Sequence, residues 1–357
     1  MGGNLLKKVG VERKSAEEYR KIVGIVISNL KEIFPSIKMA EIKAYEEKDS
    51  FGDADILVEY DDLPGNWIDI IKLKLNPTEF ISNRSNGGRK ASQEVHSFDF
   101  MNLQIDLIMA PKDLFDFSMN YLSFNDLGNL MGVIAHNMGL KYGSSGLMAP
   151  LRAQGDGHQY AEVAVTKSSE EAIRFLGYDF DRFRKGFRNL EEIFEFVISS
   201  EFIERKIYLL ENRNNKSRTR DKKRTTYTQF LQWIGNRPDA DKFRWPKEND
   251  EDGKVEIKKM FLEKVKNSFP DFKKRLEGEA QEMAMSASVK LKWNGVLVKK
   301  WTDANDIDLY QIMLKAFEKN EFKKWVVGAA ELELIEYAKN VFSLIEQSKK
   351  LENKIKF

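Results

Sequence analysis

Three aspartates occupy positions in the sequence that could bring like charges together. Asp53 and Asp55 occur in "FGDADILV", where they lie two positions apart at the start of an apolar, β-type run. Alternate residues of a strand point to the same face, so both carboxylates should leave the same side of the strand. Asp106 occurs in "QIDLI", a second apolar run in which a lone carboxylate needs a partner. If the two strands are neighbours, the three carboxylates converge.

Converging carboxylates repel one another unless cations neutralise them. Cysteine is absent and only three histidines occur, so a metal would have to be held by carboxylates, which favours Mg²⁺ or Mn²⁺. A pair of such ions is the usual arrangement for displacement at phosphorus. The sequence therefore predicts Asp53, Asp55 and Asp106 as catalytic and metal-binding residues for two ions. Taken singly, each pattern has a simpler explanation, because G-D-x-D is common by chance and Asp106 could face solvent at a strand end.

The surrounding segments predict the elements that position these aspartates. Residues 15–34 have the pattern of an amphipathic helix that begins with a capping box of Ser15 and Glu18 and ends at Pro35. "MAEIKAY" and "ADILVEY" predict strands, whereas "WIDIIKLKL" fits either a strand or a short helix. "SFDFMNLQIDLIMAP" predicts one or two strands, with Asp106 near the end of the last. Residues 112–140 predict a helical segment that stops near Gly139.

The remainder of the chain is predicted to be mostly helical. Residues 168–200 predict two short helices, of which the first has a serine cap. Residues 211–226 are basic and polar, and we expect a domain boundary or a mobile loop there. In "SVKLKWNGVLVKKW" the Asn294-Gly295 pair predicts a β-hairpin with a type I′ turn. The final helix should begin near Ala330, and the expected fold class is α+β.

The order of these segments resembles the DNA polymerase β (family X) branch of the nucleotidyltransferase superfamily. "FGDADILV" resembles the paired-aspartate strand of that family, and "QIDLI" resembles its third-aspartate strand. "MNYLSFNDLGN" resembles the segment that lines the incoming nucleotide. The resemblance covers roughly residues 15–200 and implies a nucleotidyltransferase palm, which is a mixed sheet flanked by helices. It also implies that Tyr121 lies against the sugar, Asp126 near the base and Asn129 at the base edge.

One feature of the family is absent from this sequence. The family usually has a Gly-Ser pair before the aspartates, at the start of a helix that cradles the triphosphate. The corresponding region here is "IKAYEEKDS", which has no such pair. The available nucleotide-binding candidates are Lys43, Lys48, Ser50 and Gly52.

A glycine-containing loop, "SNRSNGGRKAS", adds further basic candidates for the triphosphate. Arg84, Arg89 and Lys90 either close on the triphosphate or form the tip of a surface hairpin. Lys141 and Arg152 are additional candidates. His136 and His158 are expected to have structural roles.

The basic segment 211–226 predicts a contact with nucleic acid. Its basic residues are Arg213, Lys216, Arg218, Arg220, Lys222, Lys223 and Arg224. Such side chains bind phosphates, and the aromatic residues that follow could stack on bases, although similar aromatics more often belong to a core. The alternative is a solvated loop. "LKWNGVLVKKWT" resembles the tail of some tRNA nucleotidyltransferases, which favours RNA over DNA as the acceptor.

Bulk composition limits the other possibilities. The net charge is only +2 over 357 residues, so any nucleic-acid contact must come from a local patch. We expect no membrane span and no signal peptide, because no apolar run is long enough. The absence of cysteine excludes disulfides and fits a reducing compartment, so a cytoplasmic location is expected.

These features together predict four parts and one activity. The parts are a palm (1–150), a thumb-like subdomain (151–210), a basic linker or loop (211–226) and a mostly helical nucleic-acid-binding domain (227–357). The predicted activity is transfer of a nucleoside monophosphate from an NTP or dNTP to the 3′-hydroxyl of a nucleic acid, with release of pyrophosphate. Asp53 and Asp55 would bind both metals, and Asp106 would bind the catalytic metal and help to deprotonate the hydroxyl.

Several alternatives for the acceptor remain open. The segment before the palm is too short for the lyase and DNA-gripping domains of repair polymerases, which favours terminal addition, for example at a tRNA 3′ end, over gap filling. A templated family X-type DNA polymerase is one alternative. A transferase that modifies a protein or a small molecule is another, and it fits the missing Gly-Ser pair. An inactive palm that only binds nucleotide is the third, although the intact set of aspartates argues against it.

Overall fold

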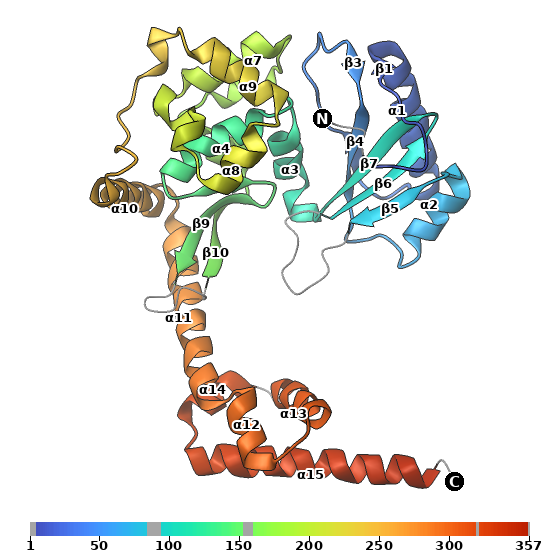
Figure 1. Ribbon diagram of the computed structural model, residues 1–357, viewed down its shortest axis with the longest axis vertical. Helices are drawn as coiled ribbons and strands as arrows, with labels where there is room; N and C mark the ends of the chain where they lie inside the picture. The colour runs from blue at the N-terminus through green and yellow to red at the C-terminus, as the bar shows by residue number, and fades with distance from the viewer. Residues whose placement is uncertain (1–4, 84–93, 153–159, 319–320, 356–357) are drawn as a thin grey trace. The chain divides into compact units, whose positions relative to one another are not determined.

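The computed structural model describes residues 5–83, 94–152, 160–318 and 321–355 (Figure 1). The chain divides into two compact units, which are Met1–Pro150 with Glu162–Phe272 and Leu151–Ala161 with Lys273–Phe357. The predicted α+β class is correct, because a mixed sheet with flanking helices precedes a helical region. No helix in the described ranges combines the length and the apolar character needed to cross a membrane.

The sheet that carries the aspartates is five-stranded in the described residues, in the order β2–β4–β7–β6–β5. Its strands are β2 (Met39–Glu41), β4 (Asp53–Glu59), β7 (Leu103–Ala110), β6 (Val95–Phe100) and β5 (Phe80–Asn83). β4 and β7 run parallel, and the other neighbouring pairs are antiparallel. The two strands predicted to carry the acidic residues are therefore neighbours at the centre of the sheet.

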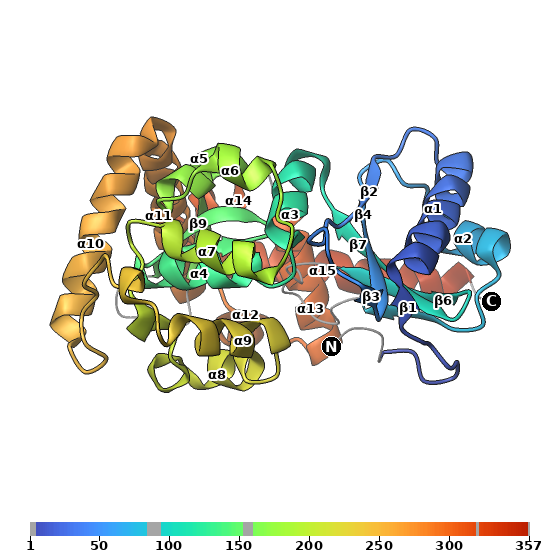
Figure 2. The same cartoon turned by 90° about the horizontal axis from the view of Figure 1, so that it is seen from above.

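Helices cover both faces of this sheet. α1 (Ala16–Ile33) and α2 (Trp67–Leu75) lie on one side, and α3 (Phe115–Leu122) lies on the other (Figure 2). α1 begins with the predicted capping box, because the Ser15 hydroxyl accepts from the backbone of Glu18 while the Glu18 carboxylate accepts from Ser15. "WIDIIKLKL", which fitted either a strand or a helix, is the helix α2.

Strand alternation decides which side chains of β4 meet which helix. Ala54, Ile56 and Val58 belong to the core under α1 and α2. Leu57 points the other way and packs with Phe115 of α3. β7 alternates in the same manner between the two cores. The face shared by Leu57 is therefore the face on which the acidic residues of β4 must lie.

The rest of the first unit is a helical assembly with a small sheet. Its helices are α4 (Leu127–Asn137), α5 (Ser169–Phe175), α6 (Phe180–Arg184), α7 (Leu190–Ser199), α8 (Asn215–Asp221), α9 (Thr225–Ile234) and α10 (Glu251–Ser268), with 3₁₀ turns η1 (Lys112–Leu114), η2 (Arg205–Tyr208), η3 (Leu210–Asn212) and η4 (Pro238–Ala240). The small sheet has the order β10 (Tyr160–Thr166), β9 (Gly146–Arg152), β8 (Lys141–Gly143), and β1 (Lys14–Ser15) pairs separately with β3 (Ser50–Phe51). Tyr227, Phe230 and Trp245 are buried, so these aromatics form core and not a stacking surface.

Residues 211–226 are not a linker or a loop. They contain α8 and the start of α9, and they lie inside the first unit, which continues to Phe272. α8 forms because Asn214 caps it by accepting from the backbone of Ser217, and because Asp221 provides a buried partner for basic side chains. The composition of the segment resembled that of a loop, but each arginine has an acceptor within the fold.

The second unit is built of helices. They are α11 (Pro270–Lys292), which begins in the first unit, α12 (Gly295–Thr302), α13 (Asp306–Glu318), α14 (Phe322–Gly328) and α15 (Glu331–Ile355). The β-hairpin predicted at Asn294-Gly295 is wrong. Asn294 caps α12 instead, accepting from the backbone of Leu297 at 3.0 Å, so the pair joins two helices. The predicted final helix is confirmed as α15.

Candidate functional site

The three predicted aspartates come together on one face of the central sheet. Asp55 and Asp106 lie directly opposite each other in the parallel β4–β7 pair, and Asp53 lies two residues before Asp55 on the same face. Each carboxylate has an oxygen within 4.8 Å of an oxygen of the other two. Asp106 lies in the middle of β7 and not near its end, because β7 continues to Ala110. This arrangement is the acidic triad.

The triad carries a substantial electrostatic penalty. Burial raises the pKa of Asp55 to about 7, and the charges of Asp53 and Asp106 contribute in the same direction. Burial also raises the pKa of Asp106, opposed by the hydrogen bonds from Gln104. The Gln104 amide donates to both oxygens of Asp106 at 3.0 Å. Three half-buried carboxylates at this spacing need a counter-charge.

A divalent cation fits the donor set of the triad. Carboxylate oxygens are the ligands that Mg²⁺ and Mn²⁺ prefer, and three of them converge here. The part of the chain that the structure describes has no second acidic or histidine group that converges in this way. The acidic triad could therefore bind a metal, and it is the best candidate for the centre of a functional site.

Lys48 is a basic residue whose ammonium interacts electrostatically with the triad. Burial lowers the pKa of its ammonium, whereas the charges of Asp53 and Asp55 raise it. Its Nζ lies 4.4 Å from the centroid of the Phe51 ring, which supports the side chain. Of the two lysines proposed in place of the Gly-Ser pair, Lys48 is thus the one whose ammonium interacts with the aspartates.

The other candidates of that segment lie differently. Arg13 donates to both the carbonyl and the hydroxyl of Ser50 at 3.0 Å, so the hydroxyl already has a partner. Lys43 is exposed, and its carbonyl accepts from the backbone of Phe124. Gly52 directly precedes β4 and is half-buried. Residues 42–49 form no helix, so the helix that cradles the triphosphate in the polymerase β family has no counterpart in this segment.

Two further residues near the triad were not predicted from the sequence. Tyr19 hydrogen-bonds to Glu41, and burial raises the pKa of Glu41 despite the nearby charges of Arg20 and Lys48. The ring of Tyr19 stacks on Phe51 at a centroid distance of 3.8 Å. Gln104, which supports Asp106, was not predicted either, although its position two residues before Asp106 on the same strand could have indicated it.

Tyr121, Asp126 and Asn129 gather beside α8. Asp126 forms an ion pair with Arg224, and the Asn129 carbonyl accepts from Arg220 at 2.7 Å. In the described residues this group makes no hydrogen bond or ion pair with the acidic triad.

Tyr121 itself is held by close packing. Its ring contacts Tyr142 edge-on at 5.4 Å. Gly128 lies directly against Tyr121, because a Cβ at position 128 would be 2.2 Å from the Tyr121 carbonyl oxygen. The glycine of "DLGN" is therefore explained by this contact, which fixes the start of α4 against the end of α3.

The remaining candidates have separate outcomes. Arg84, Arg89, Lys90 and His158 lie outside the described residues. Lys141 forms an ion pair with Glu162 at 2.9 Å. Arg152 is the last residue of β9.

The basic segment separates into two kinds of residue. Arg213 and Arg220 both pair with Asp221, which is fully buried. Arg218 donates to the carbonyls of residues 210, 211 and 213. By contrast, three lysines are exposed and form no ion pair within the described ranges; they are Lys216, Lys222 and Lys223. We call them the lysine triplet.

Replacing Asp55 with asparagine is expected to stabilise the metal-free protein at high pH. The folded protein keeps the Asp55 proton up to about pH 7, whereas the unfolded chain loses it near pH 4. Stability therefore falls as pH rises through this window and stays low above it. Asp55→Asn removes this loss, so the stability advantage of the variant over the wild type should be small at pH 4 and about 4 kcal/mol at pH 8.

Urea unfolding in EDTA at both pH values, followed by tryptophan fluorescence, measures this difference. Asp69→Asn is the matched control, because Asp69 is exposed on α2. Added Mg²⁺ should reduce the advantage of Asp55→Asn, since a bound cation stabilises the charged wild type. An asparagine variant less stable than wild type at pH 8 in EDTA would contradict the prediction.

Comparison with known proteins gives no family. No protein-family model matches the chain, and no curated protein matches its sequence.

Proposed function

We propose that the protein is a metal-dependent nucleotidyltransferase that uses the acidic triad. The observation that carries this proposal is the register of β4 and β7, which sets Asp55 opposite Asp106 with Asp53 on the same face. A carboxylate cluster of this kind, half-buried on a central sheet, suits divalent cations better than any other ligand. The order of the segments along the chain, which resembles the polymerase β superfamily, agrees with a nucleotidyltransferase palm.

The triad residues would have two roles, metal binding and proton transfer. Asp53, Asp55 and Asp106 would hold the ions, which when bound neutralise phosphate charge and lower the pKa of an attacking hydroxyl. In the reaction the acceptor oxygen forms a bond to the α-phosphorus, and the bond to the departing pyrophosphate breaks. Asp106 is the residue proposed to bind the catalytic ion and to help deprotonate the hydroxyl, in keeping with the resemblance of its strand to the third-aspartate strand of the polymerase β family. Lys48 would attract the triphosphate to this face.

The proposed substrates are an NTP or dNTP and the 3′-hydroxyl of a nucleic acid. The lysine triplet supports a nucleic acid as the acceptor, since these side chains are exposed, have no carboxylate partner among the described residues and are free to bind phosphates. A protein or small-molecule acceptor is the second candidate. The observation in its favour is that residues 42–49 form no helix, which separates this chain from polymerases that cradle the triphosphate there.

Extension assays with three acceptors test the proposal. The protein is incubated with Mg²⁺ or Mn²⁺, each labelled NTP and dNTP, and tRNA lacking its 3′ end, single-stranded DNA or gapped DNA. A metal-dependent product supports nucleotidyl transfer and identifies the acceptor. Nucleotide binding without any product would favour the protein or small-molecule acceptor. Absence of both product and nucleotide binding would overturn the proposal.

Neutralising the lysine triplet is expected to weaken nucleic-acid binding in a salt-dependent way. Each lysine that contacts a phosphate releases counterions, so the slope of log K against log[salt] should become shallower by about 0.7–0.9 per lost contact. Fluorescence anisotropy with a labelled single strand at several salt concentrations gives this slope for the variant carrying Lys216→Gln, Lys222→Gln and Lys223→Gln.

An equal charge change elsewhere is the control. Lys31, Lys185 and Lys259 are exposed and belong to the same unit. The variant in which all three are replaced by glutamine should keep the wild-type slope to within about 0.9, the change expected for one lost phosphate contact. If both triple variants lower the slope equally, the attraction is a property of net charge and the triplet is not a binding surface.

A further inference from the structure

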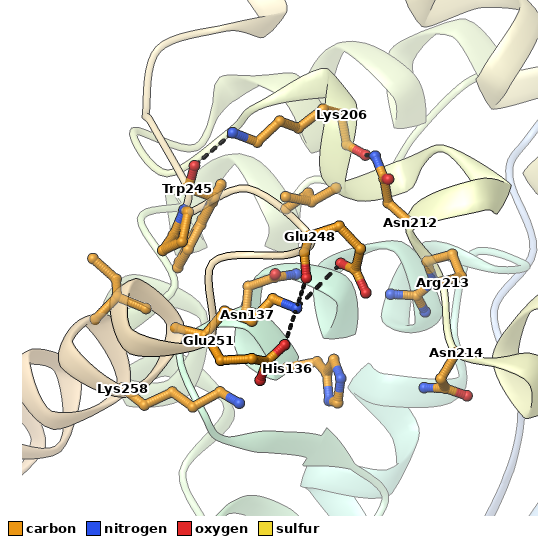
Figure 3. A pocket seen from close by; sticks show the side chains of 14 residues that line it. His136, Asn137, Lys206, Asn212, Arg213, Asn214, Trp245, Glu248, Glu251 and Lys258 are labelled. Carbon is orange, nitrogen blue, oxygen red and sulfur yellow. Dashed lines mark hydrogen bonds and ion pairs between the residues drawn. The ribbon is translucent and has the colours of Figure 1, made fainter.

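A polar pocket of about 250 Å³ lies in the first unit, lined by residues outside the acidic triad. Its walls come from the end of α4, from the segment between η2 and α8, and from α10 with the residues before it. Figure 3 shows His136 in this pocket with Arg213 on one side and Lys258 on the other. Nothing in the proposed transferase reaction uses these side chains, so the pocket needs its own explanation.

Ion pairs around the pocket leave an excess of positive charge. Asp221 is shared by Arg213 and Arg220, at 3.4 and 2.9 Å. Glu204 is likewise shared by Lys206 and Arg244, at 3.0 and 3.5 Å. Each of these acids therefore neutralises only one of its two basic neighbours.

The acidic residues of the pocket wall do not cancel this excess. Glu248 and Glu251 are both paired with Lys254, at 3.5 and 3.0 Å. Lys258 forms no ion pair within the ranges that the structure describes. When the pairs of Lys254, Asp221 and Glu204 are counted together with Lys258, the surroundings of the pocket keep a net positive charge.

Several hydrogen-bond donors in the pocket have no protein acceptor. Arg213 is 8% exposed, and its bonds to Asp221 use Nε and Nη2, which leaves Nη1 without an acceptor in the described residues. The Asn214 carbonyl oxygen caps α8, so its amide group is available to donate. The positive charges of Arg213 and Lys258 also act on His136, whose pKa is lowered first by its partial desolvation and then by those two residues.

Lys258 is an exposed residue whose aliphatic stem packs against the backbone at Gly139. Gly139 has φ +81°, and a Cβ at that position would lie 2.9 Å from Cγ of Lys258. The aliphatic part of Lys258 therefore packs directly on the backbone that ends α4. In Figure 3 the ammonium end of Lys258 points toward His136.

We propose that this pocket binds a phosphate group. A phosphate presents several acceptor oxygens around one centre, which match a guanidinium, an ammonium, an imidazole and an amide better than a single carboxylate would. The group could be carried by a small phosphorylated molecule or by the end of a nucleic-acid strand, which share this chemistry. The proposal stands independently of the acidic triad, because none of the residues that line the pocket belongs to it.

Nuclear magnetic resonance of histidine provides a local test in the full-length protein. The chain has only three histidines, so the His136 ring signal can be assigned by its loss in His136→Gln. Inorganic phosphate is titrated at constant ionic strength and pH, with sodium chloride as the reference salt. The His136 signal should shift with phosphate and saturate. Lys258→Gln should weaken this binding by about threefold to tenfold, because one charged donor is lost.

Lys259→Gln is the matched control, since Lys259 is exposed on α10 as Lys258 is but does not line the pocket. It should bind phosphate as the wild type does. No saturable shift of His136, or equal weakening by Lys258→Gln and Lys259→Gln, would overturn the proposal. Both variants keep the acidic triad, so loss of phosphate binding here and failure of the transferase assay are separate results.

The source of the phosphate is distinguished by oligonucleotides. A single strand with a 5′-phosphate is compared with the same strand carrying a 5′-hydroxyl. Tighter binding of the phosphorylated strand that disappears in Lys258→Gln supports a strand end as the ligand. Equal binding of both strands, together with a saturable shift by inorganic phosphate, supports a small phosphorylated molecule.

Discussion

Replacing Asp106 with asparagine is expected to lower the rate of metal-dependent nucleotide transfer by at least about a thousandfold, or about 4 kcal/mol of transition-state stabilisation. Asparagine keeps the size of the side chain but removes both the negative charge that holds a cation and the oxygen that accepts a proton. Asp106 is the carboxylate that β7 contributes to the triad, so its loss leaves this strand without a ligand there. Single-turnover incorporation of labelled nucleotide measures the effect.

Asp69→Asn serves as the control for this loss, because it makes the same chemical change on the exposed surface of α2. The stability of Asp106→Asn in EDTA should not fall below that of the wild type, since removing one of three like charges relieves repulsion. Inactivity with unchanged folding therefore separates a catalytic role from a structural one. An Asp106→Asn variant that keeps more than about a tenth of wild-type activity would remove the triad from the mechanism.

Replacing Asp221 with alanine is expected to destabilise the first unit by about 3–5 kcal/mol. Asp221 is fully buried and accepts from Arg213 and Arg220, and it lies 3.5 Å from the Asn129 amide. Its removal leaves the buried guanidinium of Arg213 without a counter-charge. Urea unfolding at neutral pH gives the change in the free energy of unfolding.

A second variant tests the reason for the loss. If the unpaired charge is the cause, Arg213→Met combined with Asp221→Ala should recover most of the stability, because an apolar side chain needs no partner. Asp239→Ala removes an exposed aspartate paired with Arg237 and should change stability by less than about 1 kcal/mol. An Asp221→Ala variant within about 1 kcal/mol of the wild type would show that the buried network contributes little.

The acidic triad could be predicted because it depends on local pattern. Asp53 and Asp55 share a face through the two-residue period of a strand, and Asp106 needed only a neighbouring strand to join them. Gly139 and the capping box of Ser15 were equally local signals. The sequence alone could not show that β4 and β7 are parallel neighbours in register, since that depends on the whole sheet.

The prediction for residues 211–226 failed because composition does not show which acceptors the fold provides, whether near in the sequence, as Asp221 is for Arg213 and Arg220, or distant. The arginines of 211–226 resemble a solvated run until Asp126 is brought beside Arg224 by the fold. The hairpin at Asn294 failed for a different reason. Val289, Trp293 and Val298 are buried, whereas Leu291 and Val296 are about 80% exposed. The buried residues follow a helical spacing, but over so short a window this spacing looks like the alternation of a strand.

The register between β4 and β7 also has a consequence for how the chain folds. Asp55 and Asp106 are far apart in the sequence, so the unfolded chain keeps their charges separated. Closing the long loop between the two strands loses entropy and, in the same step, brings the carboxylates together. Formation of the central strand pair is thus opposed by the lost chain entropy and by the repulsion between the carboxylates until the hydrophobic side chains on either face are buried. A cation captured by the half-formed pair would therefore act on the folding rate as well as on the finished site.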